Sequence, residues 1–181
     1  MLRSITCLLL ITLVVSCTNA PVSNTKTATK KAVNTAAGIT KIDTSFTGFK
    51  IAAIMDDTKI IFTAHGKQDA ENRETTTGFF IKGFSGMDDK AAEENLQAIV
   101  YDRKHSGNVA NTENETIKIY NTSVGKAIIT TVTLKYKNNK IAVATTATVS
   151  NGKNAILFVG EDYSNGDYTD KFKSTFNSIE F

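Results

Sequence analysis

The chain has 181 residues, of which 41% are hydrophobic and 22% charged, so it is long enough for one packed domain and too short for two large ones. The net charge of +3 arises near the amino terminus, where Arg3 and four lysines precede Asp43, the first acidic residue. Residues 43–181 hold 16 basic and 18 acidic residues, a balance that excludes the clustered basic face of a nucleic-acid-binding protein.

Residues 1–16 have the organisation of an export signal, with Arg3 before an apolar stretch over residues 5–15. A helix of that stretch would reach about 16 Å, short of the ~30 Å hydrocarbon core, so a permanent membrane span is not expected. The residues Val14-Val15-Ser16-Cys17 resemble the bacterial lipobox. This resemblance implies cleavage before Cys17 and a diacylglyceryl group on its sulfur. The alternative is an ordinary secretory signal cleaved near Ala20.

Lipidation at Cys17 would account for both cysteines of the chain. Cys7 lies inside the apolar stretch and would be removed, so Cys17 would be the one remaining thiol, and no disulfide or thiolate site is expected. By resemblance to bacterial lipoproteins, Thr18 in place of an aspartate implies attachment to the outer membrane. The absence of an acidic tract after Cys17 implies a domain that faces the periplasm. The expected membrane contact is therefore the lipid itself.

Residues 17–42 are rich in threonine, alanine and asparagine and show no apolar periodicity. Such a segment buries too little surface to offset the entropy of ordering, which predicts a flexible lipidated tether. The remaining residues, 43–181, are interpreted as a single α+β domain.

The amino-terminal half of the domain predicts strands followed by a helix. Residues 46–55 and 59–64 are β-branched and apolar and flank a turn, so they predict a hairpin, and a third strand is expected over residues 75–84. Residues 88–107 then show apolar side chains at helical spacing, with Asp88 placed to cap the amino terminus and basic residues in the last turn. A polar linker and a short strand over residues 116–120 follow.

The carboxyl-terminal half predicts a three-strand meander. Asn138-Asn139 and Asn151-Gly152 are turn signals that divide residues 127–160. If each pair forms a two-residue turn, Tyr136 lies opposite Ile141 and Ala147 lies opposite Ile156, and the bulky apolar residues share one face. The opposite face is expected to be partly exposed and carries Thr131, Thr133, Lys135, Ala142, Thr146 and Thr148.

A terminal helix follows the meander. Tyr168, Phe172, Phe176 and Ile179 are spaced by four, four and three residues, which predicts an aromatic stripe that packs on the apolar face of the sheet. The predicted fold class is therefore α+β: an antiparallel β-sheet, formed by the hairpin and the three-strand meander, packed by a central helix and a carboxyl-terminal helix.

Two segments resemble the PsbP-like family, which includes photosystem extrinsic subunits and small bacterial lipoproteins. They are YNTSVGKAIITTVTLKY, whose glycine enters a long strand, and NAILFVGEDYSNGDYTDKFKSTFNSIEF, in which an apolar strand and a polar loop lead to a helix. Together with the order of elements, the resemblance covers about two thirds of the chain. It implies an antiparallel sheet packed by helices, with a binding or assembly role and not catalysis.

No catalytic signature is present, and two groups of residues remain as candidates. The loop EDYSNGDYTD offers oxygen ligands that suit calcium, from Glu161 and from Asp162, Asn165, Asp167 and Asp170. However, Gly166 stands where an EF-hand has a ligand, and turn and helix capping explains the same residues. The histidines, His65 and His105, are expected at the surface or at a helix end.

The sequence therefore predicts a lipid-anchored bacterial envelope protein that acts as a non-enzymatic binding or assembly module, with no cofactor and with an unidentified protein or small-ligand partner. One rival is an envelope hydrolase that uses carboxylates and a histidine on the open sheet face. The other is a structural envelope component. Convergent aspartate, glutamate and histidine side chains in a pocket would favour the hydrolase.

Overall fold

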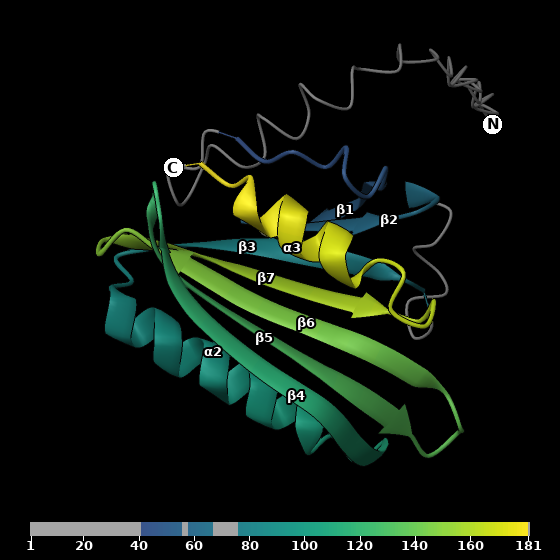
Figure 1. Cartoon of the computed structure of the whole chain (residues 1–181). Helices are drawn as coiled ribbons and strands as arrows, with labels where there is room; N and C mark the ends of the chain where they lie inside the picture. Colours follow the sequence, from purple (N-terminus) through teal and green to yellow (C-terminus); the bar gives the residue numbers. More distant parts are fainter. Residues whose placement is uncertain (1–40, 56–57, 67–75, 181) are drawn as a thin grey trace, which may run out of the picture.

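The computed structural model describes residues 41–55, 58–66 and 76–180, which form a mixed α+β fold as predicted (Figure 1). The elements are β1 (Lys50–Met55), β2 (Lys59–Thr63), β3 (Gly78–Ser85), α2 (Asp89–Lys104), β4 (Val109–Thr122), β5 (Gly125–Tyr136), β6 (Ile141–Ser150), β7 (Asn154–Asp162) and α3 (Thr169–Asn177). The predicted signal and Cys17 lie outside the described residues. The polar loop after β2 also lies outside them, apart from Gly66. Among the described helices, none combines the length and hydropathy needed to cross a membrane.

All seven strands belong to one antiparallel sheet with the order β1-β2-β3-β7-β6-β5-β4. The prediction combined a hairpin and a meander in one antiparallel sheet without stating which strands join them. In the structure β3 pairs with β7 along eight residue pairs, from Gly78 opposite Glu161 to Ser85 opposite Asn154, and so joins the first three strands to the meander in a continuous sheet.

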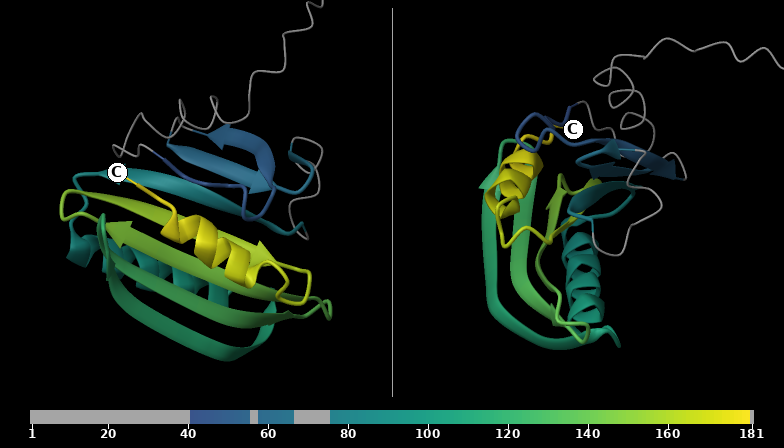
Figure 2. Two further views of the ribbon diagram at one scale, coloured as in Figure 1. Left: turned by 45° about the horizontal axis from the view of Figure 1, so that its top comes forward. Right: turned by 90° about the vertical axis from the view of Figure 1, so that its right-hand side faces the viewer.

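The two helices cover opposite faces of this sheet (Figure 2). Because side chains alternate along a strand, Ile129 and Phe158 face α3, whereas Ile128 and Leu157 face α2. Leu96 of α2 is buried against the second pair. The sheet is therefore apolar on both sides, and the prediction of one partly exposed face is wrong.

The terminal helix packs as its aromatic stripe predicts. Phe172, Phe176 and Ile179 are buried, and the ring of Phe172 lies within 6 Å of the rings of Phe79 and Phe158, at 5.7 and 5.9 Å between centroids. Gly160 on β7 leaves the space that this packing needs, because a Cβ there would come within 2.7 Å of the Phe172 ring.

The central helix begins and ends where the sequence predicts. The carboxylate of Asp88 accepts a hydrogen bond from the backbone N–H of Ala91 at 2.8 Å, which caps the first turn. Arg103 and Lys104 lie in the last turn, where positive charge complements the helix dipole.

The fourth strand is longer than the sequence predicts. The predicted strand covered residues 116–120, whereas β4 begins at Val109 and ends at Thr122. Its polar first half pairs with the end of β5, and a bulge near Asn114, which has a positive φ of 53°, interrupts the register. The interpretation of this half as a linker is wrong because pairing to the long β5 outweighs weak local β-propensity.

The turn between β5 and β6 differs from the prediction by one residue. The N–H of Tyr136 donates to the carbonyl oxygen of Lys140 at 2.8 Å, so three residues connect the strands, and Asn139 takes a left-handed conformation with φ 63°. Lys135, and not Tyr136, therefore lies opposite Ile141. A slip of one residue turns β5 over relative to the predicted arrangement.

The turn between β6 and β7 is centred one residue later than predicted. The N–H of Asn151 donates to the carbonyl oxygen of Asn154 at 3.1 Å, and Gly152, with φ 83°, is the first central residue. Ala147 therefore lies opposite Phe158, two residues from its predicted partner. A shift of two residues keeps each side chain on its predicted face.

The residues predicted to share one partly exposed face are divided between the two faces. Thr131, Thr133 and Lys135 lie on the side of α3, whereas Ala142, Thr146 and Thr148 lie on the side of α2. Four of the six are buried: Thr131, Ala142, Thr146 and Thr148.

Two residues that the sequence assigned to the tether contact the domain. Lys41 and Glu180 exchange backbone hydrogen bonds at 3.4 and 3.0 Å, and their side chains form an ion pair at 2.8 Å. Ile42 packs against the aromatic core beneath α3.

Candidate functional site

A cluster of ionisable side chains surrounds Glu161 near the end of β7. Its Oε1 lies 2.6 Å from Nη2 of Arg103 and accepts a hydrogen bond from the hydroxyl of Tyr136 at 3.3 Å. Its Oε2 accepts a second hydroxyl bond from Tyr163 at 2.7 Å. The carboxylate is therefore held by one cation and two neutral donors.

Three elements bring this cluster together. Arg103 lies in the last turn of α2, Tyr136 ends β5, and Glu161 follows Leu157 and Val159 on the α2 face of β7. Tyr163 comes two residues later, and its ring stacks on that of Tyr136 at 6.2 Å between centroids. The cluster thus lies at the end of the apolar interface between α2 and the sheet, where the contacts become polar.

The environment keeps both tyrosines in their neutral form. Burial raises the pKa of Tyr163, and the hydrogen bond and the negative charge of Glu161 raise it further. Burial and the charge of Glu161 also raise the pKa of Tyr136. Both hydroxyls consequently remain hydrogen-bond donors at neutral pH and cannot act as bases there.

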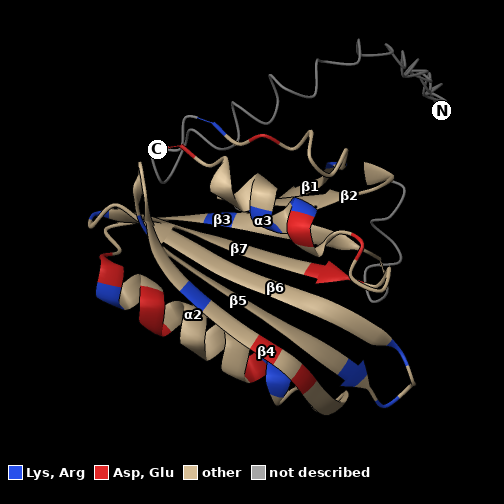
Figure 3. Cartoon of the chain, viewed as in Figure 1, with Lys and Arg blue, Asp and Glu red and all other residues tan. Residues whose placement is uncertain are grey.

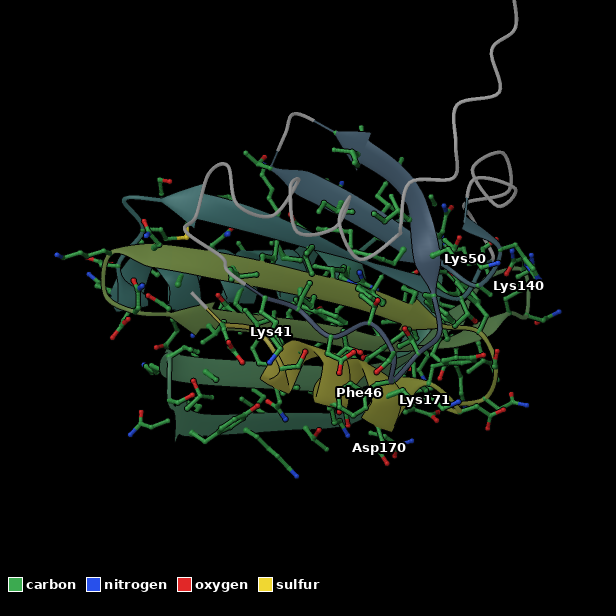
Figure 4. The ribbon with its side chains drawn as sticks, turned by 90° about the horizontal axis from the view of Figure 1, so that it is seen from above. Lys41, Phe46, Lys50, Lys140, Asp170 and Lys171 are labelled. Carbon is green, nitrogen blue, oxygen red and sulfur yellow. The ribbon has the colours of Figure 1, made fainter. Side chains whose placement is uncertain are left out.

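A surface pocket of about 380 Å³ adjoins this cluster and shares Tyr163 with it. We call it the sheet-end pocket, and it is lined by Asn139, Lys140, Ile141, Tyr163 and Asn165. Asn139 and Lys140 come from the turn between β5 and β6, Ile141 begins β6, and the other two come from the loop between β7 and α3. In Figure 4, Lys140 lies at the rim of the molecule, away from Lys41.

The backbone of both segments is shaped by asparagines. Asn139 and Asn165 have left-handed conformations, with φ values of 63° and 57°, which asparagine tolerates better than most residues. Within the described part of the chain, the side chains of Asn139, Lys140 and Asn165 form no hydrogen bond or ion pair. The pocket therefore presents polar groups that no side chain among the described residues occupies.

The predicted calcium ligands do not converge. Asp162 is fully buried, and its two carboxylate oxygens accept hydrogen bonds from the backbone N–H groups of Ser164 at 2.8 Å and Tyr168 at 2.6 Å. Asp170 points to solvent and pairs with Lys173 at 3.1 Å. Across residues 41–55, 58–66 and 76–180, no three histidine, cysteine or acidic side chains form a metal-binding group. Asp162 thus organises the loop through backbone capping.

The two histidines lie at the surface and neither lines the sheet-end pocket. His105 follows the last turn of α2, where its ring stacks on Tyr101 and its Nδ1 lies 2.8 Å from the carbonyl oxygen of that residue. His65 follows β2.

Sequence reasoning placed Glu161 in the acidic loop but missed its pairing with Arg103. One signal was available, because Leu157, Val159 and Glu161 alternate on one side of a buried strand and a charged group in that series needs a partner. Comparison with models of known protein families and with curated proteins finds no match.

Proposed function

We propose that this chain is a non-enzymatic binding module, held at the outer membrane by a lipid on Cys17 with its domain facing the periplasm. The lipobox Val14-Val15-Ser16-Cys17 and the short apolar stretch before it support the anchor. A sheet covered by a helix on each face is consistent with kinship to PsbP-like proteins, in line with the strand and helix segments that resemble that family.

The observation that carries the binding role is the contrast between the sheet-end pocket and the cluster beside it. In the cluster, Glu161 is already satisfied by Arg103 and two tyrosines. In the pocket, Asn139, Lys140 and Asn165 line an open concavity with no partners among the described side chains. In ligand sites, a small number of such polar groups fixes the orientation of the ligand.

The same contrast argues against a hydrolase at this place. A general base must have a lone pair free to accept a substrate proton. The carboxylate of Glu161 has one cation and two hydroxyl donors directed at it, and the raised pKa values of Tyr136 and Tyr163 keep those hydroxyls protonated. Three donors are thus committed to a charge that is already present, which suits a structural role for Glu161 better than the role of a catalytic base.

The test uses the full chain, produced in bacteria and purified in detergent, in ligand-observed NMR with a panel of small envelope metabolites. Ile141→Trp fills the pocket, whereas Ile117→Trp changes a similarly exposed isoleucine on β4 and serves as its control. We expect at least one compound to bind wild type and the control but not the Ile141 variant. Binding that Ile141→Trp leaves intact, or no binding by any compound, would contradict the proposal.

Two further measurements address the anchor and the rival functions. Mass spectrometry of the mature amino terminus should find an acylated Cys17, and Cys17→Ala should release the protein from outer-membrane fractions. Substrate turnover that His65→Ala or Glu161→Gln abolishes would instead support the hydrolase. A chain that binds nothing, and whose deletion weakens the envelope, would support the structural role.

A further inference from the structure

We infer that the sheet-end pocket takes a small anionic polyol, a sugar-sized compound that carries a carboxylate or a phosphate, with Lys140 as the group that binds its charge. This inference rests on the proposed binding function and specifies the ligand class of the same pocket. Three properties of the pocket support it: the charge, the hydrogen-bonding groups and the size.

The charge of the pocket is positive. Lys140 is the one charged residue among the five that line it, and its ammonium has no carboxylate partner in the described part of the chain. The neighbouring charges cancel each other, because Glu161 pairs with Arg103 at 2.6 Å and Lys135 pairs with Glu113 at 2.6 Å. A ligand that reaches the pocket therefore meets the ammonium of Lys140, which no described carboxylate neutralises.

Among the residues that the structure describes, the acidic side chains near the pocket leave that charge in place. Asp162 is fully buried, with both oxygens on backbone N–H groups, and Asp167 is exposed in the same loop but does not line the pocket. Lys137, three residues before Lys140, is exposed and adds positive charge to the same turn. Figure 3 shows blue segments, which mark lysines, in this turn between β5 and β6.

The uncharged lining suits a polyol. The amides of Asn139 and Asn165 each offer donors and an acceptor, which can bind hydroxyl groups of either hydrogen-bond polarity. Ile141 and the ring of Tyr163 supply apolar surface, and Ile141 is 48% exposed. A sugar ring has both kinds of surface, with hydroxyls at its edge and C–H groups on its faces.

The size and rigidity of the pocket limit the ligand. A volume of about 380 Å³ lies at the small end of ligand sites, so a monosaccharide or disaccharide fits and a longer chain would extend into solvent. The cluster around Glu161 holds Tyr163 in place through its 2.7 Å hydrogen bond, so one wall of the pocket is fixed before the ligand arrives.

The test measures the affinities of three probes for the full chain in detergent: glucuronic acid, glucose 6-phosphate and glucose. We expect at least one charged sugar to bind about tenfold more tightly than glucose, since a charged hydrogen bond contributes roughly that factor. The two acids distinguish a carboxylate site from a phosphate site. Raising the salt concentration should weaken the binding of the charged sugars and leave that of glucose unchanged.

Lys140→Gln should remove the tenfold preference, whereas Lys153→Gln should preserve it, because Lys153 is an exposed lysine in the other turn of the meander and does not line the pocket. Equal affinity for glucose and both acids, no binding by either acid, or a preference that survives Lys140→Gln would overturn the inference. The proposed function would still stand in each case if Ile141→Trp abolished the binding of some other compound.

Discussion

Gly160 of β7 lies directly beneath the ring of Phe172 of α3, and this contact sets how closely the terminal helix approaches the sheet. A Cβ at position 160 would meet two atoms of that ring at 2.7 and 2.9 Å, and the ring of Phe158 at 3.3 Å. Both rings are fully buried, so neither has room to move without displacing other core residues.

Gly160→Ala should therefore lower the free energy of unfolding by about 2 kcal/mol, the usual cost of overpacking a core. Gly107→Ala is the matched control, because a Cβ there would meet nothing within 4 Å. Urea denaturation followed by circular dichroism measures both variants. Equal midpoints for the two would contradict the packing described for α3.

Thr145 and Thr148 are both buried threonines of β6, yet their hydroxyls differ. The Thr145 hydroxyl has no partner among the described residues, whereas the Thr148 hydroxyl donates to the carbonyl oxygen of Ile156 at 3.0 Å. Valine has nearly the same shape and no hydroxyl. We expect Thr145→Val to leave stability unchanged or raise it by up to about 1 kcal/mol, and Thr148→Val to lower it by about 1 kcal/mol. Thermal unfolding of the pair checks this, and the reverse order would contradict it.

Asp162 should act as a backbone cap and not as a metal ligand. Asp162→Ala leaves the N–H groups of Ser164 and Tyr168 without their acceptor, which should cost about 2 kcal/mol. The exposed Asp170 serves as the control, and Asp170→Asn should change stability by less than about 0.5 kcal/mol.

Calcium discriminates between the two roles of this loop. A bound ion would stabilise the folded state by mass action and raise the melting temperature. Because Asp162 and Asp170 do not converge, we expect the melting temperature to be the same in calcium chloride and in a chelator. A rise that Asp162→Ala abolishes would restore the calcium interpretation.

Tyr163 should make the fold sensitive to alkaline pH. Its pKa is raised in the folded state, so above pH ~10 the unfolded chain loses the proton first and stability falls as the pH rises. The slope is at most about 1.4 kcal/mol per pH unit for each such tyrosine, and Tyr136 acts in the same direction. Below pH ~9 this contribution is constant.

Tyr163→Phe should make that alkaline decline shallower, whereas Tyr101→Phe, at an exposed ring on α2, should not. Urea unfolding at several pH values between about 8 and 11 measures the slopes. Identical slopes for wild type and Tyr163→Phe would show that this hydroxyl ionises equally in the folded and unfolded states.

Local signals were sufficient to predict the two described helices. Asp88 caps the first turn of α2 through a contact three residues away, and the stripe of Phe172 and Phe176 follows from helical periodicity alone. Neither feature depends on which strand lies beneath the helix. Both features depend on residues that are within one or two helical turns of each other in the sequence, which is why they could be predicted.

The strand registers were not predicted correctly because a turn signal does not state how many residues the turn contains. The Asn138-Asn139 pair suits both a two-residue and a three-residue connection, and the structure has the latter, with Asn139 left-handed. The alternation of β5 could not decide between them, since both of its faces are apolar. Ile128 lies against α2 and Ile129 against α3.

The sheet-end pocket and its supporting cluster depend on long-range topology. Arg103 and Glu161 are 58 residues apart in sequence, and the pocket joins the turn at Lys140 to the loop at Asn165. These groups meet only because β5, β6 and β7 are neighbours in the sheet and α2 lies across them. No residue spacing in the sequence indicates that these groups are close together in the fold.

The bridge between Lys41 and Glu180 gathers both ends of the described chain at one end of the molecule, and the turn between β5 and β6 lies at the other (Figure 1, Figure 2). Coupling the protein to a sensor chip at either end of the described chain would thus leave Lys140 and its pocket turned toward the solution. If the domain is attached to a surface through a tether, the same geometry would place the turn between β5 and β6 on the side away from that surface.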